Sequence, residues 1–177
     1  MKVVFCDIDG VLNSFQSIEA ARRIKSNRQD SIGINEDCFC PMAISNLNIL
    51  FEDIHNLWGV VSSTWRKHYD IEQIRNFLSM AGFLYPWKIF DITPTRLSNR
   101  HRGNEIHWWL SDYAEEYEVN SFVILDDNSD MNPYEKHLVQ TNGKHGFMYE
   151  DLIKSIEGFN SGEFSYDREL DKKRYER

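Results

Sequence analysis

The chain has 177 residues, of which 41% are hydrophobic and 14% aromatic, and 20 Lys and Arg against 28 Asp and Glu give a formal charge of −8. A chain of this length buries roughly 70% of its unfolded surface, enough for one domain without disulfides or a structural metal. The composition excludes intrinsic disorder, no apolar run approaches the ~20 residues of a membrane span, and the net charge argues against broad non-specific duplex binding.

The chain start and the cysteines bear on location and redox state. Asp7 interrupts the first apolar run early, so we expect no signal peptide and a cytoplasmic protein. The three cysteines, Cys6, Cys38 and Cys40, cannot all pair, which predicts reduced, partly buried thiols. The spacing of Cys38 and Cys40 has no matching Cys or His pair, so a zinc site is disfavoured.

Short apolar runs recur along the chain, and the first three end in polar side chains. Continuous apolar runs are typical of strands buried in a parallel sheet. The runs are residues 3–6 before Asp7 and Asp9, 57–61 before Ser62, Ser63 and Thr64, and 122–125 before Asp126 and Asp127. A further short strand is expected at 138–140.

Helical patterns separate these runs, because apolar residues recur there at three- and four-residue steps. Pro41 suits the first turn of a helix, and Asp70 with Gln73 resembles a capping box. The aromatic residues of the stripe over 106–117 favour core packing over a base-stacking platform. The predicted helices follow Pro41 as far as residue 54, follow Asp70 as far as 78, and cover 106–117 and 149–159.

Alternating strands and helices predict right-handed βαβ units and a doubly wound α/β sheet. Such sheets bind ligands outside the carboxyl ends of their strands. We therefore expect the polar residues that end the first three runs to converge on one edge. The charged segment 163–177 is expected to be a frayed tail or a solvated helix, following a single domain over 1–162.

The convergent edge predicts a magnesium site and a phosphoryl substrate. Four neighbouring carboxylates, from Asp7, Asp9, Asp126 and Asp127, repel one another unless a cation offsets them, and oxygen ligands suit Mg²⁺. An ionised Asp7 attacking phosphorus and a protonated Asp9 serving the leaving oxygen would divide the work of phosphate ester cleavage. Hydroxyls and backbone amides at residues 62–64 suit the phosphoryl oxygens.

Three segments in chain order carry a family resemblance. Asp7-Ile8-Asp9-Gly10-Val11-Leu12-Asn13 looks like motif I of the haloacid dehalogenase (HAD) superfamily, residues 60–63 resemble motif II, and residues 123–127 resemble motif IV. Segments 63–66, 102–110 and 124–131 are similar to the small HAD domains of RNA-repair proteins and of phage or bacterial polynucleotide and nucleotide phosphatases. The resemblance covers residues 3 to about 157 and implies a Rossmannoid three-layer α/β/α fold, a mainly parallel sheet and a minimal cap.

The resemblance also implies residue roles. Asp7 would be the nucleophile that forms an aspartyl-phosphate, and Asp9 the general acid and base. Mg²⁺ would be held by Asp7, the backbone carbonyl of Asp9, Asp126 and Asp127. Ser62 would bind the transferring phosphoryl group, with Ser63 as a second hydroxyl.

Motif III usually supplies a lysine beside the nucleophile, and this chain departs from it. Lys88 lies too far before the helix start at Gly103, so we assign the role to Arg102, whose guanidinium can bind both carboxylate and phosphate. Thr64, Trp65 and Arg66 are expected to bind substrate at the cleft.

Two of these assignments have alternatives. In the alternative, Trp65 packs at the start of an ordinary helix and Arg66 is a solvated residue of that helix. Asp130 suits either a second layer around the metal or an N-cap for the segment at 132–133.

The expected cap is small, because 27 residues separate Asn13 from Pro41 and no large insertion lies between Thr64 and Arg102. Segment 14–40 would be a flap or minimal cap over an open cleft that admits a bulky ester. Two clusters of basic residues are expected near the proposed cleft. Arg22, Arg23, Lys25 and Arg28 would contact extra phosphates or form a solvated helix, and Arg96, Arg100, His101 and Arg102 form the second cluster.

We expect a Mg²⁺-dependent phosphomonoesterase acting on a nucleotide or a nucleic-acid terminal phosphate. One alternative is a catalytically silent HAD-like module that binds a nucleotide or a protein, but it would typically have lost one of the four aspartates. Another is a Toprim-like nuclease or phosphodiesterase, which would carry a Glu after the first strand in place of Asp7 and Asp9. The sequence leaves the oligomeric state open.

Overall fold

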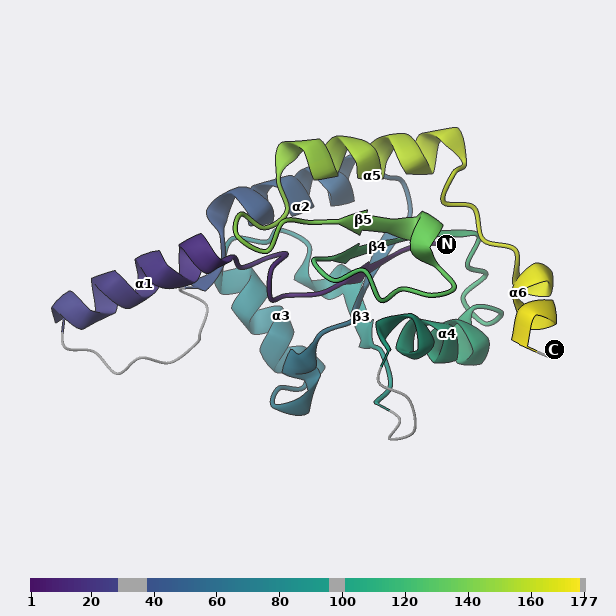
Figure 1. Cartoon of the computed structure of the whole chain (residues 1–177), viewed down its shortest axis with the longest axis horizontal. Coiled ribbons are helices and arrows are strands. Elements are labelled where there is room, and N and C mark those ends of the chain that lie inside the picture. The colour runs from purple at the N-terminus through teal and green to yellow at the C-terminus, as the bar shows by residue number, and fades with distance from the viewer. Residues whose placement is uncertain (29–37, 96–100, 176–177) are drawn as a thin grey trace.

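The computed structural model describes residues 1–28, 38–95 and 101–175. In this part of the chain, five parallel strands form one sheet in the order β3-β2-β1-β4-β5 (Figure 1). The predicted parallel α/β architecture is confirmed. The strands are β1 (Lys2–Cys6), β2 (Leu57–Val61), β3 (Ile89–Ile92), β4 (Ser121–Asp126) and β5 (Leu138–Gln140).

Strand β3 is absent from the sequence-based prediction. Its four residues include Asp91, which interrupts the apolar run that would otherwise indicate a strand. Asp91 Oδ2 accepts a hydrogen bond of 2.6 Å from the indole Nε1 of Trp109. A partner from a distant helix therefore satisfies this carboxylate at the sheet edge, which no local pattern reveals.

The predicted helices all form, and Asp70 with Gln73 makes a capping box at the start of α3. Within the described residues, no helix is both long and apolar enough to cross a membrane. The helices are α1 (Phe15–Arg28), α2 (Pro41–Asp53), α3 (Ile71–Met80), α4 (Arg102–Tyr113), α5 (Tyr149–Ser161) and α6 (Arg168–Tyr175), and the 3-10 turns are η2 (Thr64–Lys67), η3 (Pro86–Lys88) and η4 (Glu135–His137).

The core has two apolar layers, one on each face of the sheet. Val4 and Cys6 of β1 pack with residues of α2, α3 and α5, whereas Val3 and Phe5 pack with residues of α4. This alternation follows from the two-residue period of a strand. Trp109 of α4 is fully buried, as expected for core packing.

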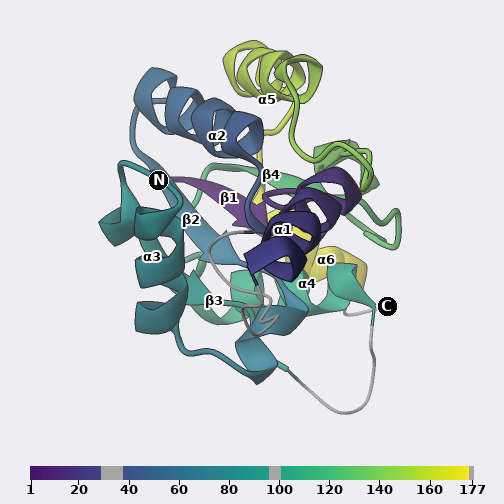
Figure 2. The same ribbon diagram turned by 90° about the vertical axis from the view of Figure 1, so that its left-hand side faces the viewer.

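Segment 14–40 leaves the sheet after β1 and returns beside its starting point. Asn13 forms a bridge with Phe39, and the Ser17 hydroxyl donates a hydrogen bond of 2.7 Å to the Cys38 carbonyl. Between them, α1 extends away from the sheet beyond the end of β1 (Figures 1 and 2). Residues 29–37 lie outside the described residues, and the flap or cap role of the segment stays a prediction.

The C-terminal segment forms helix α6, and the helix is anchored to the domain. Asp171 is 6% exposed, and its Oδ2 accepts hydrogen bonds from the hydroxyls of Tyr134 at 2.8 Å and Tyr166 at 3.2 Å. The sequence expectation of a frayed tail or a solvated helix is therefore right only in part, because one acidic residue of the helix is buried.

Candidate active site

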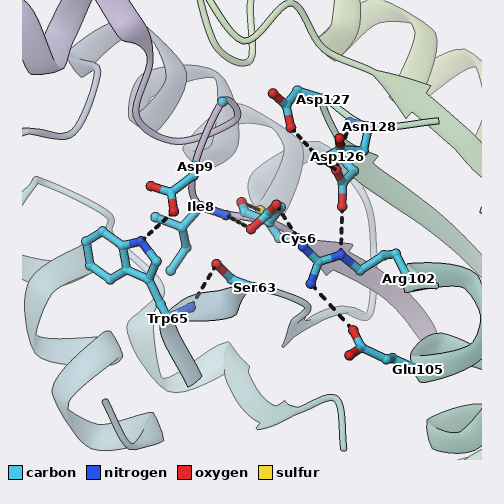
Figure 3. A network of polar contacts seen from close by, with 12 residues as sticks. Cys6, Ile8, Asp9, Ser63, Trp65, Arg102, Glu105, Asp126, Asp127 and Asn128 are labelled. Carbon is cyan, nitrogen blue, oxygen red and sulfur yellow. Dashed lines mark hydrogen bonds and ion pairs between the residues drawn. The ribbon is translucent and has the colours of Figure 1, made fainter. Parts of the chain in front are cut away.

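Polar side chains follow the carboxyl ends of the central strands. In the strand order, β1 lies between β2 and β4. The strands that follow β1 in the chain are therefore added first on one side of it (β2, β3) and then on the other (β4, β5), and α/β sheets bind ligands at this switch in strand order. The Asp7 amide donates to the Leu125 carbonyl at 2.9 Å, and the Ser62 amide donates to the Cys6 carbonyl at 2.9 Å. These bonds bring the residues that follow β1, β2 and β4 together (Figure 3).

Three carboxylates form the centre of the site. Asp7, Asp126 and Asp127 each offer one oxygen, and these oxygens lie within 4.8 Å of one another. Burial raises the pKa of Asp126 to about 7, with the charge of Asp7 as a further cause. Burial also raises the pKa of Asp7, although Arg102 and a hydrogen bond from Ser63 oppose the shift. The ionised forms of these carboxyl groups are therefore disfavoured, and a bound cation would stabilise them.

The donor set fits a hard divalent cation. It consists of carboxylate oxygens on short turns, the ligands that Mg²⁺ prefers. Asp126 Oδ2 is buried, and its one close contact with a donor among the described residues is the ion pair with Arg102 Nε at 3.1 Å.

The sharp turn after Asp9 depends on Gly10. Its φ is +78°, a conformation that residues with a Cβ rarely adopt, and a Cβ there would lie 2.5 Å from Asp127 Cγ. The glycine thus lets the loop after β1 approach the loop after β4. The Asp-x-Asp-Gly pattern has a structural reason at this position.

Arg102 supplies the positive charge of the site. Its NH2 lies 3.0 Å from Asp7 Oδ2, and its Nε lies 3.1 Å from Asp126 Oδ2. One planar guanidinium thereby contacts two carboxylates from different strand ends, which a lysine point charge would not match. Lys88 lies elsewhere, over the rings of Phe51 and Tyr85.

The N-terminus of α4 positions Arg102. The amide of Arg102 donates to Asp130 Oδ2 at 3.4 Å, and the amide of Gly103 donates to the Asp130 carbonyl at 3.2 Å. Asp130 therefore holds the first turn of α4, and its expected place in a second layer around the metal stays a prediction. Arg96 and Arg100 of the second basic cluster lie outside the described residues, and His101 is exposed.

Asp9 is exposed and is held by two side chains. Its Oδ1 accepts a hydrogen bond of 2.8 Å from Asn13 Nδ2. Its Oδ2 accepts one of 3.0 Å from Trp65 Nε1 (Figure 3). Trp65 itself is 6% exposed and packs against the rings of Phe39 and Tyr69. Trp65 thus packs in the core, as one sequence interpretation expected, and also orients Asp9, a side chain of the site.

The two serines after β2 differ in their surroundings. The Ser63 side chain lies near enough to Asp7 to lower the pKa of that carboxyl, and its hydroxyl accepts a hydrogen bond from the amide of Trp65 at 3.4 Å. The Ser62 hydroxyl is buried and has no hydrogen-bond partner among the described residues. Ser63, which the sequence ranks second, thus influences the proposed nucleophile, and the phosphoryl-binding role of Ser62 stays a prediction. Thr64 is exposed at the start of η2.

Arg66 lies beneath the site. Its side chain is 5% exposed and forms an ion pair of 2.5 Å with Glu105, which in turn lies 3.6 Å from Arg102 NH1. Arg66 also donates to the Ser63 carbonyl at 2.9 Å. The expectation that Arg66 lines the substrate cleft does not fit this burial, since its charge is already paired.

Three polar residues at the site were not assigned from the sequence. Asn13 contacts Asp9, Glu105 connects Arg66 to Arg102, and Asn128 donates to Asp126 Oδ1 at 2.9 Å through its amide. Two of them carried a local signal. Glu105 follows Arg102 by three residues on a helix, and Asn128 suits a turn after Asp126.

The three cysteines have no assigned role in the proposed chemistry of the site. Burial raises the pKa of Cys6 well above its usual value, and its Sγ donates to the Asp7 carbonyl at 3.1 Å. Cys38 and Cys40 are also unpaired. Cys6 is thus a neutral packing residue under the site.

Comparison with models of known protein families identifies the family of this chain. The family described as the HAD domain in Swiss Army Knife RNA repair proteins matches residues 3–152. The chain belongs to this HAD family. The match spans every residue proposed for the site, whereas α6 lies beyond it. HAD proteins are generally hydrolases, and the phosphatases among them typically use Mg²⁺.

Solved structures show the same HAD fold. The HAD domain of the effector protein Lem4 from Legionella pneumophila is 18% identical with a TM-score of 0.51, and the alignment covers 88% of this chain and 93% of that one. An inactive mutant of that domain gives 16% identity, a TM-score of 0.51, and coverages of 98% and 97%. A HAD-like hydrolase from Streptococcus pneumoniae is 12% identical with a TM-score of 0.42, over 86% of this chain and 90% of that one. No curated protein matches the chain significantly.

Proposed function

We propose that this HAD protein is a Mg²⁺-dependent phosphomonoesterase that works through an aspartyl-phosphate on Asp7. The observation that carries the proposal is the meeting of Asp7, Asp126 and Asp127 within 4.8 Å, with Arg102 in contact with the first two. A silent binding module has no need to keep three repelling carboxylates in a buried cluster.

The covalent step follows from the positions of the two motif I aspartates. Asp7 forms a bond from its carboxylate oxygen to phosphorus, and the bond from phosphorus to the ester oxygen breaks with its electron pair on that oxygen. The Asp9 carboxyl then gives its proton to the leaving oxygen. Asn13 and Trp65 hold Asp9 in one orientation for this transfer.

The second step restores the enzyme. Asp9, now a carboxylate, takes a proton from a water molecule whose oxygen bonds to phosphorus, and the bond between phosphorus and Asp7 breaks. Inorganic phosphate leaves, and Asp7 regains its carboxylate. Bound Mg²⁺, held by Asp7, Asp126 and Asp127, would supply charge neutralisation for the phosphoryl oxygens. Arg102 and the Ser63 hydroxyl bind the same group from the protein side.

A nucleotide or a nucleic-acid end is the substrate class we propose. The matching family is described from RNA repair proteins. Segment 14–40 places one helix beyond the end of β1, and Arg22 and Arg23 of this helix are exposed. Lys25 and Arg28 of the same cluster have no described side chains.

The test compares wild type with Asp7→Asn and Asp9→Asn, with and without Mg²⁺. The substrates are nucleoside monophosphates, 3′- and 5′-phosphorylated oligonucleotides, and sugar phosphates. We expect phosphate release that needs Mg²⁺, that disappears in Asp7→Asn, and that falls at least about a hundredfold in Asp9→Asn. The exposed Asp53→Asn serves as a matched control that keeps wild-type rates.

Each alternative has a distinct outcome. Activity that persisted in Asp7→Asn would exclude the covalent mechanism. Cleavage of phosphodiesters rather than monoesters would support a nuclease. Binding of a nucleotide without turnover of any ester would support a silent module.

A further inference from the structure

A pocket opens beside Asp9, on the side away from the carboxylate cluster. It has a volume of about 260 Å³ and is lined by Asp9, Thr64, Trp65, His68 and Tyr69. In Figure 3, Asp9 and Trp65 lie on one side of the site, and Asp126 and Asp127 lie on the other. Because Asp9 serves the leaving oxygen in the proposed function, the pocket lies where the leaving group would extend.

The walls of the pocket form a rigid aromatic surface. Tyr69 packs edge-on against Phe77 with ring centroids 5.0 Å apart, and its ring lies 5.5 Å from that of Trp65. The amides of His68 and Tyr69 both donate to the Trp65 carbonyl, at 2.9 and 3.0 Å. The amide hydrogen bonds hold the turn, and the ring contacts hold the Tyr69 and Trp65 side chains before any ligand arrives, so binding loses little conformational entropy.

The remaining walls are polar. Thr64 and His68 are exposed and offer a hydroxyl and an imidazole beside the rings. A flat ring with hydrogen-bonding edges matches this combination, since unstacked nucleobases bind aromatic side chains by stacking and polar groups by their edges. A cavity of about 150 Å³ already holds benzene, so this pocket has room for one base and none for a run of bases.

We infer that this pocket binds the nucleobase next to the phosphate that is removed, so that Tyr69 and His68 select nucleotides over sugar phosphates. The inference rests on the proposed function, because it places the leaving group at Asp9. Free nucleotides and nucleic-acid ends share this chemistry. A phenyl ring fits the aromatic walls but leaves the polar groups of Thr64 and His68 without partners.

The kinetic test compares adenosine 5′-monophosphate with ribose 5-phosphate. Both esters release a primary alcohol at the same carbon of the sugar, so the ratio of their kcat/KM values isolates the base. We expect wild type to favour the nucleotide by roughly tenfold or more. Tyr69→Leu and His68→Ala should lower this ratio toward one, and Tyr69→Phe, which keeps the ring, should preserve it. Melting temperatures check that each variant is folded.

Further substrates distinguish a free nucleotide from a nucleic-acid end as the molecule that supplies the base. Comparable preference for a 5′-phosphorylated oligonucleotide would indicate a nucleic-acid end, and preference for the mononucleotide alone would indicate a free nucleotide. Equal kcat/KM values for nucleotide and ribose 5-phosphate would overturn the inference. A stronger preference for O-phosphotyrosine, or a ratio unchanged in folded Tyr69→Leu and His68→Ala, would also overturn it.

A binding measurement separates this inference from the proposed function. The indole N–H resonance of Trp65, assigned by its loss in Trp65→Phe, should shift on titration with adenosine 5′-monophosphate and stay in place with ribose 5-phosphate. If the resonance shifts but no ester is hydrolysed, the pocket stands and the proposed function fails. If esters are hydrolysed and neither the resonance nor the rates respond to the base, the pocket assignment fails and the function stands.

Discussion

Asp126 shows how far the environment of one residue changes its chemistry. It is fully buried at the end of β4, and burial together with the Asp7 charge raises its pKa to about 7. Arg102 lies 3.1 Å away and offsets the shift only in part. A cation beside the cluster would favour the ionised form of all three carboxylates at neutral pH.

This raised pKa predicts an unusual dependence of stability on pH. Between about pH 4 and pH 7, folded Asp126 keeps its proton while the unfolded chain releases it, so the free energy of unfolding decreases as pH rises through this window. Without divalent cations, we expect a melting temperature several degrees lower at about pH 8 than at about pH 5. Mg²⁺ should restore much of the difference, as measured by thermal unfolding.

The variant Asp126→Asn is the control for this prediction. It has no proton to lose, so its melting temperature should change less between the two pH values and respond less to Mg²⁺. Equal pH dependence in Asp126→Asn and wild type would show that Asp126 is not the cause.

At the residue scale, the identities of the candidate residues were largely predictable and their contacts were not. Asp7, Asp9, Asp126 and Asp127 follow apolar strands, and strand periodicity indicates where they lie. The hydrogen bond from Trp65 to Asp9 joins residues 56 positions apart, and only the packing of the Trp65 ring directs it.

Helix α4 is the element on which the site most depends. Its N-terminus carries Arg102, and its first turn packs directly on the loop after β4. A Cβ added at Gly103 would lie 2.7 Å from the Met131 carbonyl carbon and closer still to the Asn132 carbonyl oxygen. Both obstructing groups are backbone atoms, so neither can rotate away.

Gly103→Ala therefore tests the packing of α4. In an unobstructed helix the change to alanine stabilises by up to about 1 kcal/mol. Here we expect the opposite sign, with a melting temperature lowered by several degrees, and the proposed phosphatase activity should weaken because Arg102 is displaced. Asn104→Ala in the same turn keeps the glycine and should stay close to wild type. A rise in the melting temperature of Gly103→Ala would contradict this account.

At the element scale, helix and strand positions followed from local patterns, with one exception. The capping box at Asp70 and the start of α2 at Pro41 were predictable because both depend on residues within one turn. Strand β3 was not, since its Asp91 is satisfied by Trp109 from another element.

Across the whole molecule, α6 extends the domain beyond the matched family region. The buried Asp171 accepts hydrogen bonds from Tyr134 and Tyr166 and lies 3.5 Å from His107 Nδ1. Burial alone would raise the pKa of Asp171, but the bonds from His107 and Tyr134 outweigh it and lower the pKa. The C-terminus is thus tied to α4 through one carboxylate.

Asp171→Asn should destabilise the whole domain by about 1–3 kcal/mol at neutral pH, because it leaves buried donors poorly matched. A lowered pKa contributes stability above the unfolded value of about 4 that is lost as pH falls, so the difference from wild type should shrink toward about pH 3.5. Urea unfolding at both pH values measures this. The exposed Asp53→Asn should show no such difference, and a gap independent of pH would contradict the role of the charge.

The sequence by itself determined the α/β class, the parallel strands and the aspartates at their ends, because burial periodicity and turn chemistry act over a few residues. The tertiary structure alone decided that Trp65 holds Asp9, that Arg66 pairs with Glu105, and that Asp171 anchors α6. These contacts depend on how elements pack and on which way each side chain points. No local pattern encodes either.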